Sequence, residues 1–270
     1  LRKGINIGFA YPDISPIMFE LGPLVIRWYS MAYLVGLLLG WWWVNRLVKK
    51  YDLKLTVQNV EDLVFYCTLG IILGGRLGYV LFYGEGMLRE NWLEVFAIWK
   101  GGMSFHGGAI GVAAAVYFYS RKIHCRFLTI TDLVVLPAPI GLFLGRLANF
   151  VNDELWGRVT DVPWAVRFPN GGFLPRHPSQ LYEAFFEGIV MFIVLNWLWT
   201  SAKVRNSPGF VSGMFVLLYG VFRIFMEQFR QPDAHMGYYF GGVTMGQMLS
   251  LPLVVLGLAV IVYSRRTKED

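Results

Sequence analysis

Ionisable side chains lie within stretches of this chain that are otherwise apolar, and their spacing puts them on shared helix faces. Tyr219, Arg223 and Glu227 follow one another at intervals of four residues. Arg230, three residues further on, extends the same face. A charged side chain at the centre of a bilayer costs about 2.5–3.5 kcal/mol on insertion scales, so such residues usually face the interior of a bundle. We therefore expect this face to line a polar cavity.

Two further stripes have the same character. Arg146 and Asn149 are three residues apart, and Arg76, Tyr79 and Tyr83 follow the i, i+3, i+7 pattern of a single helix face. Three such stripes facing one another would give a cavity cationic walls. Guanidinium groups bind phosphate in a bidentate manner, so we expect an anionic ligand that carries a phosphate.

The intramembrane charges also have structural explanations. Arg27 and Asp132 lie near the ends of apolar runs, from which their side chains could reach the interface. Glu183 and Glu187, four residues apart on one face, could pair with an arginine for structure alone. For Arg76, Arg146 and Arg223 such explanations are weaker, and a functional role is favoured.

The composition indicates what kind of molecule carries these residues. Of 270 residues, 56% are hydrophobic and only 16% are charged, against about 25% in an ordinary soluble domain. An aromatic content of 17% excludes disorder, and two cysteines exclude a disulfide scaffold. The net charge of +6 does not indicate nucleic-acid binding, because the basic residues are scattered in short loops. What remains is a polytopic membrane protein.

Seven apolar runs are long enough to approach the roughly 20 residues that a membrane-spanning helix needs. They cover about residues 24–44, 60–83, 103–120, 128–150, 179–200, 210–229 and 243–264. None shows the two-residue alternation of barrel strands. We expect an all-α bundle of about seven transmembrane helices with an internal polar cavity, forming one domain over residues 1–270. Pro137 and Pro139 should kink the fourth span.

Outer-side segments and orientation follow from the remaining residues. Residues 1–23 are expected to form an arm on the membrane interface, and the longest loops are 84–102 and 151–178. One set of loops carries twelve basic residues: Arg46, Lys49, Lys50, Lys54, Arg121, Lys122, Arg126, Lys203, Arg205, Arg265, Arg266 and Lys268. The other set carries eight: Arg2, Lys3, Arg89, Lys100, Arg158, Arg167, Arg176 and Arg230. The positive-inside rule therefore places the C-terminus in the cytoplasm and the N-terminus outside.

The densest polar run covers residues 145–158 and reads GRLANFVNDELWGR. It resembles the signature G-R-x-x-N-F-x-N-x-E-x-x-G-R of the bacterial prolipoprotein diacylglyceryl transferases. Further motifs of that family occur in the same order along most of the chain. They are WY at 28–29, GGRLGY at 74–79, GGMSFHGG at 101–108, RHPSQLYE at 176–183 and FRQPD at 229–233.

The resemblance implies an activity that the residues alone do not. Members of this family lie in the bacterial inner membrane with seven helices and the N-terminus outside. They transfer the diacylglyceryl group of phosphatidylglycerol to the thiol of the lipobox cysteine in a prolipoprotein signal peptide. A thioether and glycerol phosphate result, in the first step of lipoprotein maturation. The resemblance implies no metal or organic cofactor and no nucleic-acid partner.

The resemblance also implies which residues carry the reaction. Positions associated with activity in the family are Tyr29, His106, Arg146, Asn149, Glu154, Gly157 and Arg223. We expect Asn152, Arg158, Glu183 and Arg230 around them or at the entrance, with Arg76 on the cavity wall. Our hypothesis is that Arg146 and Arg223 hold the phosphate, while Tyr219 and Glu227 orient Arg223.

His106 is the candidate base for the acceptor thiol, because an ordinary histidine titrates near pH 6.5. Two alternatives stay open. A field of arginines could lower the pKa of the thiol, and His106 could be a helix-end residue that bonds to the backbone.

Other function classes compete with a transferase. A transporter of anionic lipids would also carry intramembrane arginines, but no inverted repeat is visible. An intramembrane serine protease would want Gly-x-Ser-Gly, whereas the run at Ser212 lacks the first glycine. An aspartyl protease needs two membrane aspartates, and only Asp132 lies in a span. A purely structural membrane protein would not keep so many costly charges.

Overall fold

The computed structural model describes residues 8–22, 24–84, 92–97, 101–231, 238–239 and 243–266. Several residues used above lie outside this part of the chain: Arg2, Lys3, Arg89, Lys100 and Lys268 of the charge count, Pro232 and Asp233 of the last motif, and the side chain of Tyr83. The chain divides into two compact units, Leu1–Gly40 with Val135–Asp270, and Trp41–Val134. Helix α1, Trp28–Lys50, begins in the first unit and ends in the second.

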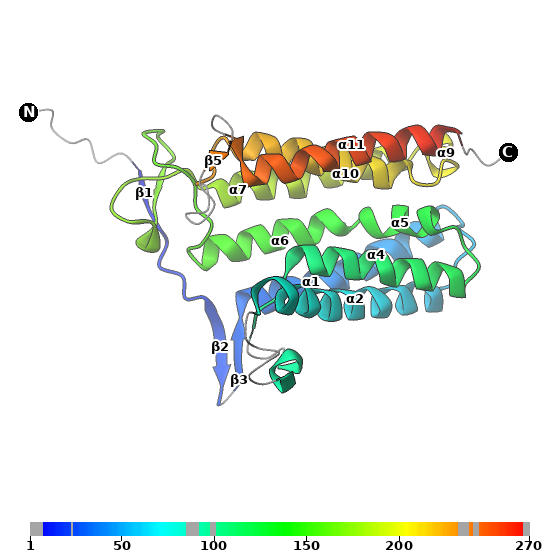
Figure 1. The fold of residues 1–270 in the computed structure, drawn as a ribbon, viewed down its shortest axis with the longest axis horizontal. Coiled ribbons are helices and arrows are strands. Elements are labelled where there is room, and N and C mark those ends of the chain that lie inside the picture. Colours follow the sequence, from blue (N-terminus) through cyan, green and yellow to red (C-terminus); the bar gives the residue numbers. More distant parts are fainter. Residues whose placement is uncertain are drawn as a thin grey trace, which may run out of the picture. The chain divides into compact units, whose positions relative to one another are not determined.

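The helices of the first unit follow the expected spans. They are α6 (Ala138–Val151), α7 (Ser179–Glu183), the π-helix η4 (Ala184–Val190), α8 (Met191–Trp199), α9 (Ala202–Arg205), α10 (Phe210–Met226) and α11 (Met245–Arg266). Helices α7, η4 and α8 run on without a break as one rod from Ser179 to Trp199. Helices α10 and α11 lie side by side (Figure 1).

Short strands of the first unit surround the helix ends. β1 (Phe9–Ala10) pairs in parallel with β4 (Val166–Arg167), and β2 (Ile17–Leu21) pairs antiparallel with β3 (Leu24–Arg27). A 3-10 turn, η3 (Pro169–Gly171), follows β4, and β5 (Tyr238–Tyr239) pairs with β6 (Val243–Thr244). The expected first span therefore begins at Trp28 and not at Leu24. Hydropathy alone did not distinguish the hairpin from the helix, although Val25 and Ile26 are β-branched residues that favour strands.

The second unit is built around two long helices. Helix α2 (Val57–Tyr83) starts with a capping box in which Thr56 and Asn59 each bond the other's backbone, and α4 (Phe105–Lys122) packs along it (Figure 1). Glycines let the two backbones touch: a Cβ added to Gly107 would lie 2.3 Å from the carbonyl oxygen of Gly74. The 3-10 turn η1 (Trp92–Phe96) and helix α5 (Phe127–Val135) complete the unit, apart from the last residue of α5.

The prolines interrupt the fourth expected span as predicted. Helix α5 ends at Val135, and α6 starts at Ala138 with Pro139 in its first turn, where a missing N–H costs nothing. Asp132, which could have reached the interface, is instead 1% exposed inside α5. Arg27 is exposed and lies in β3.

The architecture is that of an all-α polytopic membrane protein. Among the described residues, four helices are long and apolar enough to cross a bilayer, or five if α5 and α6 form one broken span. Large apolar side chains are exposed along them, for example Leu38 on α1 and Val255 on α11, which suits contact with lipid. Each of the seven expected runs is helical over most of its length, but α10 has only 17 residues and α4 is not among the helices that are long and apolar enough to span. The count of seven spans in one domain stays a prediction.

Candidate active site

Glu183, at the end of α7, is the centre of the polar interior of the first unit. Its Oε2 lies 2.7 Å from Nη1 of Arg146 on α6. Its Oε1 lies 3.5 Å from Nη1 of Arg223 on α10 and 3.8 Å from Nη1 of Arg230. The carboxylate is only 1% exposed, so its charge is stabilised by three guanidinium groups in place of water. The two arginine stripes predicted from spacing therefore meet at one acidic side chain.

Glu187 holds Arg146 from a second side. Arg146 donates to Glu187 Oε2 from Nη2 at 3.0 Å and from Nε at 3.2 Å. Glu187 is completely buried and lies in η4, the π-helical segment that follows Glu183. Single π-turns inside α-helices occur often at functional sites, where they re-aim side chains. Glu183 contacts Nη1 of this guanidinium, and Glu187 contacts Nε and Nη2. Together the two carboxylates fix its plane.

Glu227 fixes Arg223 in the same way. Arg223 Nη2 lies 2.6 Å from Glu227 Oε1, and Glu227 Oε2 accepts a hydrogen bond of 2.8 Å from the hydroxyl of Thr244. A Cβ added to Gly246 would meet the Glu227 carboxylate, so a larger residue there would require this side chain to shift. This is the contact expected if Glu227 orients Arg223. We refer to Arg146, Glu183, Glu187, Arg223, Glu227 and Arg230 as the arginine–glutamate cluster.

Two tyrosines border the cluster. Tyr219 lies within electrostatic range of Arg146, Arg223 and Glu187, and its ring stacks on Phe215 with the centroids 6.3 Å apart. Tyr29, in the first turn of α1, lies within range of Arg146 and Glu154, and its hydroxyl is 3.5 Å from that of Tyr33. Both tyrosines therefore lie near the arginines, and their predicted roles in catalysis and substrate binding stay predictions.

The loop after α6 organises the second half of the 145–158 motif. Asn149 donates to Glu154 Oε1 at 2.8 Å, and Asn152 donates to the same oxygen at 3.4 Å. The residues on either side of Glu154 have left-handed backbones, with φ of 52° at Asp153 and 58° at Leu155. This turn presents Glu154 to solvent while both asparagine amides hold its carboxylate.

Asp153 fastens the same loop from inside. It is 8% exposed, and its Oδ2 accepts a hydrogen bond of 2.6 Å from the backbone N–H of Asn170. Burial raises the pKa of this carboxyl group, and the hydrogen bond from Asn170 opposes part of that shift.

Gly157 and Arg158 attach the loop to the end of α10. Gly157 donates its backbone N–H to the carbonyl of His177, and a Cβ there would lie 2.6 Å from the carbonyl oxygens of His177 and Phe229. Arg158 donates to the carbonyls of Arg230 at 2.9 Å and of Glu227 at 3.2 Å. The glycine is required by this close approach, and the arginine caps the carbonyls that follow α10. Their predicted role in binding substrate stays a prediction.

The second unit contains the other two predicted site residues. Arg76 on α2 donates from Nε to Val95 O at 2.8 Å and from its two Nη atoms to the carbonyls of Glu94, Gly101 and Gly102. Its guanidinium thereby fixes η1 and the backbone of Gly101 and Gly102. His106 is exposed in the first turn of α4 and makes no hydrogen bond within the part of the chain that the structure describes.

Sequence reasoning missed two residues near the site. Thr244, which holds Glu227, lies in β6, where no spacing links it to α10. His177 lies 3.2 Å from the hydroxyl of Tyr182, which also accepts a hydrogen bond of 2.6 Å from Trp164. Burial lowers the pKa of His177, which favours the neutral ring. His177 was visible only as part of the RHPSQLYE motif.

The accessible part of the cluster suits an anion, although its formal charges balance. Three guanidinium groups pair with three carboxylates, and Arg158 beside them donates to the backbone carbonyls of Arg230 and Glu227. Arg146 and Arg223 are each 15% exposed at the side chain, whereas the carboxylates are nearly inaccessible. The accessible surface of the cluster is therefore contributed by the arginines. Among the described residues, no three His, Cys, Asp or Glu side chains converge as a metal site needs.

Comparisons with known proteins agree with this chemistry. The family profile described as prolipoprotein diacylglyceryl transferase matches residues 16–263. A phosphatidylglycerol–prolipoprotein diacylglyceryl transferase of Paramagnetospirillum magneticum is 51% identical over 263 residues, covering 97% of this chain and 98% of that protein. Proteins of the same name from Rhodospirillum rubrum and Vibrio atlanticus are 50% and 49% identical, covering 96% and 94% of this chain and 95% and 92% of their own lengths.

Proposed function

The chain belongs to the prolipoprotein diacylglyceryl transferase family, and on that premise we propose that the arginine–glutamate cluster carries out the transfer. The protein is a membrane-embedded transferase that moves a diacylglyceryl group from phosphatidylglycerol to a prolipoprotein. The single observation that supports the assignment to the cluster is its geometry. Two arginines, each 15% exposed at the side chain, are held in place by three buried carboxylates.

Arg146 and Arg223 stabilise the phosphate as it leaves. In the reaction, a bond forms between the thiol sulfur and the glycerol carbon that carries the phosphate ester, and the bond between this carbon and the ester oxygen breaks. The electron pair of the broken bond stays on the ester oxygen of glycerol phosphate. Guanidinium groups already held in position cost little reorganisation when this charge develops, so they lower the barrier. The fork of Arg146 is fixed by Glu183 and Glu187, and that of Arg223 by Glu227.

The thiol must lose its proton, since the thiolate is the nucleophile. His106 is the proposed base, because its side chain is exposed in the first turn of α4, where its ring contacts that of Phe105 edge to face. The alternative is that the positive field of the arginines lowers the thiol pKa without a dedicated base. The two differ in one respect: only a histidine base makes the rate fall when the imidazole is replaced.

Residues around the cluster take supporting roles. Glu154, held by Asn149 and Asn152, presents a carboxylate close to Tyr29. We propose that this group orients the headgroup glycerol hydroxyls or the incoming peptide. Gly157, Arg158 and Arg230 keep the loop against α10, and we propose that they border the entrance to the site. Arg76 holds η1 and the backbone of Gly101 and Gly102 in the second unit.

We place the protein in the bacterial inner membrane with its N-terminus outside and its C-terminus in the cytoplasm, on the distribution of basic residues. The peptide substrate is then a prolipoprotein signal peptide with its lipobox cysteine, and nucleic acid is not a partner. Tyr29 at the start of α1 and the loop after α6 belong to the outer side in this orientation.

Mass spectrometry of a lipobox peptide incubated with the purified protein and phosphatidylglycerol tests the proposal. The wild type should add a diacylglyceryl mass to the cysteine, and Arg146→Ala and Arg223→Ala should both abolish the gain. Lys54→Gln, an exposed charge far along the chain from the cluster, is the matched control and should keep the wild-type rate. A folded wild-type protein that binds the lipid and adds no mass would contradict the proposal and favour a transporter.

A further inference from the structure

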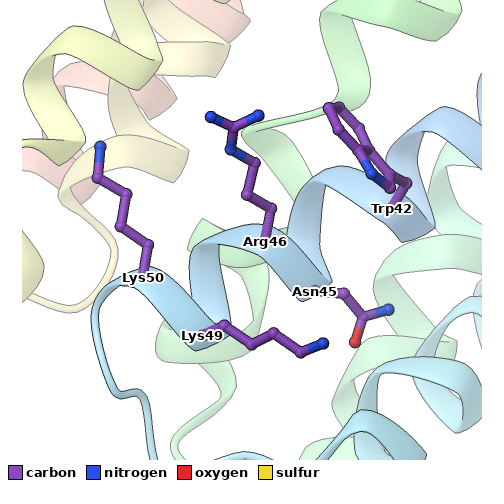
Figure 2. Close-up of a pocket in the computed structure, with 5 residues that line it drawn as sticks. All are labelled: Trp42, Asn45, Arg46, Lys49 and Lys50. Atoms are coloured by element: carbon purple, nitrogen blue, oxygen red, sulfur yellow. The ribbon is translucent and has the colours of Figure 1, made fainter.

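The last three turns of α1 carry a basic stripe on the side away from the core. Trp42, Arg46 and Lys50 are spaced four residues apart and extend from one side of the helix, as Figure 2 shows. Asn45 and Lys49 extend from the neighbouring side. The opposite face packs inward through the buried side chains of Val44, Leu47 and Val48. This end of α1 is therefore anchored to the protein and presents its charges outward.

The charges of the stripe are not neutralised within the described part of the chain. None of the ion pairs found there involves Arg46, Lys49 or Lys50. The Arg46 guanidinium instead lies 5.7 Å from the ring centroids of both Trp42 and Trp43. Lysines in the last turn of a helix interact favourably with the helix dipole. That effect does not explain an arginine one turn earlier that contacts two indole rings.

A hollow of about 510 Å³ lies over the stripe and is lined by Trp42, Asn45, Arg46, Lys49 and Lys50. The amide of Asn45 donates to the carbonyl of Trp41, and its Oδ1 is buried without a hydrogen-bond partner in the described residues. Such an orphaned acceptor suits a hydroxyl donor. The residues that line the hollow thus include three cationic donors, Arg46, Lys49 and Lys50, and one acceptor, Asn45 Oδ1.

Exposed apolar side chains lead into the hollow along the helix. Leu38 and Leu39 are 55% and 40% exposed one turn before Trp42, which is itself 49% exposed. Tryptophan at such a position is typical of the boundary between acyl chains and headgroups. A ligand with an apolar tail and an anionic head would therefore match the surface, whereas free phosphate would use only its basic end.

We propose that the end of α1 binds the headgroup of an anionic phospholipid in the cytoplasmic leaflet, with the phosphate between Arg46 and Lys50. Clusters of basic residues at a cytoplasmic helix end are attracted to anionic lipids. The site is distinct from the active site, because Arg46 follows Tyr29 by 17 residues, about 25 Å along the same helix. The inference rests on the membrane orientation of the proposed function but not on its chemistry.

Photo-crosslinking tests the site with a phosphatidylglycerol probe that carries a diazirine on its headgroup, followed by peptide mass spectrometry. The wild type should be labelled on the peptide containing residues 42–50. Arg46→Gln/Lys50→Gln should weaken this labelling about 30-fold, since each basic residue near an anionic surface contributes about 1 kcal/mol. Lys54→Gln/Arg121→Gln removes two exposed charges elsewhere in the same unit and should leave the labelling unchanged.

Competition identifies the ligand. Unlabelled phosphatidylglycerol should compete with the probe at 42–50, whereas phosphatidylcholine and inorganic phosphate should not. Equal labelling of wild type and Arg46→Gln/Lys50→Gln would overturn the proposal, as would equal competition by phosphatidylcholine or competition by inorganic phosphate alone. Thermal unfolding of the variants checks that they are folded.

The peptide transfer assay run on the same samples separates this inference from the proposed function. Loss of transfer without loss of labelling at 42–50 would contradict only the proposed function. Unchanged transfer with no labelling at 42–50 would contradict only this inference.

Discussion

Two intramembrane arginines of this protein are satisfied in opposite ways. Arg146 is held by the carboxylates of Glu183 and Glu187, with its charge compensated and its side chain still 15% exposed. Arg76 donates to four backbone carbonyls, which neutralise no charge but engage the fork of the guanidinium. The sequence presents both as an arginine within an apolar run, and the cost of burying a charge is similar for both.

The difference shows that an intramembrane arginine is not by itself evidence of catalysis. Carbonyls accept hydrogen bonds and fix a nearby segment, so Arg76 is suited to shape the connection between α2 and α4. Carboxylates fix the plane of a guanidinium and leave its outer edge for a ligand, so Arg146 is suited to meet an anion. Four predictions test this contrast, from the largest expected effect to the smallest.

Replacing Glu183 by glutamine should have the largest effect on folding. The variant leaves the charges of Arg146, Arg223 and Arg230 without their shared partner, and breaking a buried ion pair in this way costs about 3–5 kcal/mol. The unfolding midpoint in mild detergent measures the loss. Glu61→Gln, which neutralises an exposed carboxylate in the first turns of α2, is the control. Equal unfolding midpoints for Glu183→Gln and wild type would show that Glu183 does not stabilise the three arginines around it.

Replacing Arg146 by lysine should chiefly slow the reaction. Lysine keeps the charge but cannot engage Glu183 and Glu187 with one planar fork, so the phosphate loses a fixed donor. A fall in kcat of about 100- to 1000-fold is expected, as for the loss of one positioned donor elsewhere. The peptide transfer assay measures it at saturating lipid. A lysine variant with the wild-type kcat would show that charge alone is sufficient and that the fork is not used.

Replacing Arg76 by glutamine should destabilise the second unit. Several carbonyls between Glu94 and Gly102 lose a charged donor, at a cost of about 1–3 kcal/mol. Hydrogen exchange of residues 92–97 and 101–104 should rise, while that of α10 stays unchanged. If protection from exchange in these segments matches that of the wild type, Arg76 does not have the structural role that distinguishes it from Arg146.

Replacing Thr244 by valine should give the smallest effect. The change removes the 2.8 Å hydrogen bond to Glu227 while keeping the shape of the side chain, for a loss of about 1 kcal/mol. Because Glu227 also pairs with Arg223, KM for phosphatidylglycerol is expected to rise a few-fold. Ser250→Ala, which removes a hydroxyl bonded only to its own helix, is the control. Equal KM values for the Thr244→Val and Ser250→Ala variants would show that the hydrogen bond from Thr244 to Glu227 does not contribute to lipid binding.

Spacing in the sequence indicated the partners of Arg146 but not those of Arg76. Glu183 and Glu187 lie on one helix face, so a pairing with an arginine could be expected, and the structure contains it. The partners of Arg76 are backbone carbonyls 18 to 26 residues later, and every residue type has such a carbonyl. No pattern of side chains could therefore have indicated them.

The same limit applies to the elements. Apolar length located the helices, and Pro137 and Pro139 marked the break between α5 and α6. Hydropathy did not reveal that Leu24–Arg27 pairs with β2, because a strand and a helix end can be equally apolar. The π-helical turn and the contact from Thr244 depend on tertiary packing, which composition and period do not encode.

The π-helical segment Ala184–Val190 has a consequence for insertions and deletions. A π-turn closes its hydrogen bonds over five residues where an α-turn uses four, so it holds a residue that a regular helix would not accommodate. Deleting one residue between Phe185 and Val190 would let the rod close as an ordinary α-helix with its ends still attached. The flanking turns would keep their faces, whereas the same deletion within α8 would turn every side chain on one side of it by about 100° relative to the other. A change of chain length by one residue is therefore accommodated in this segment and not in the regular helix that follows it.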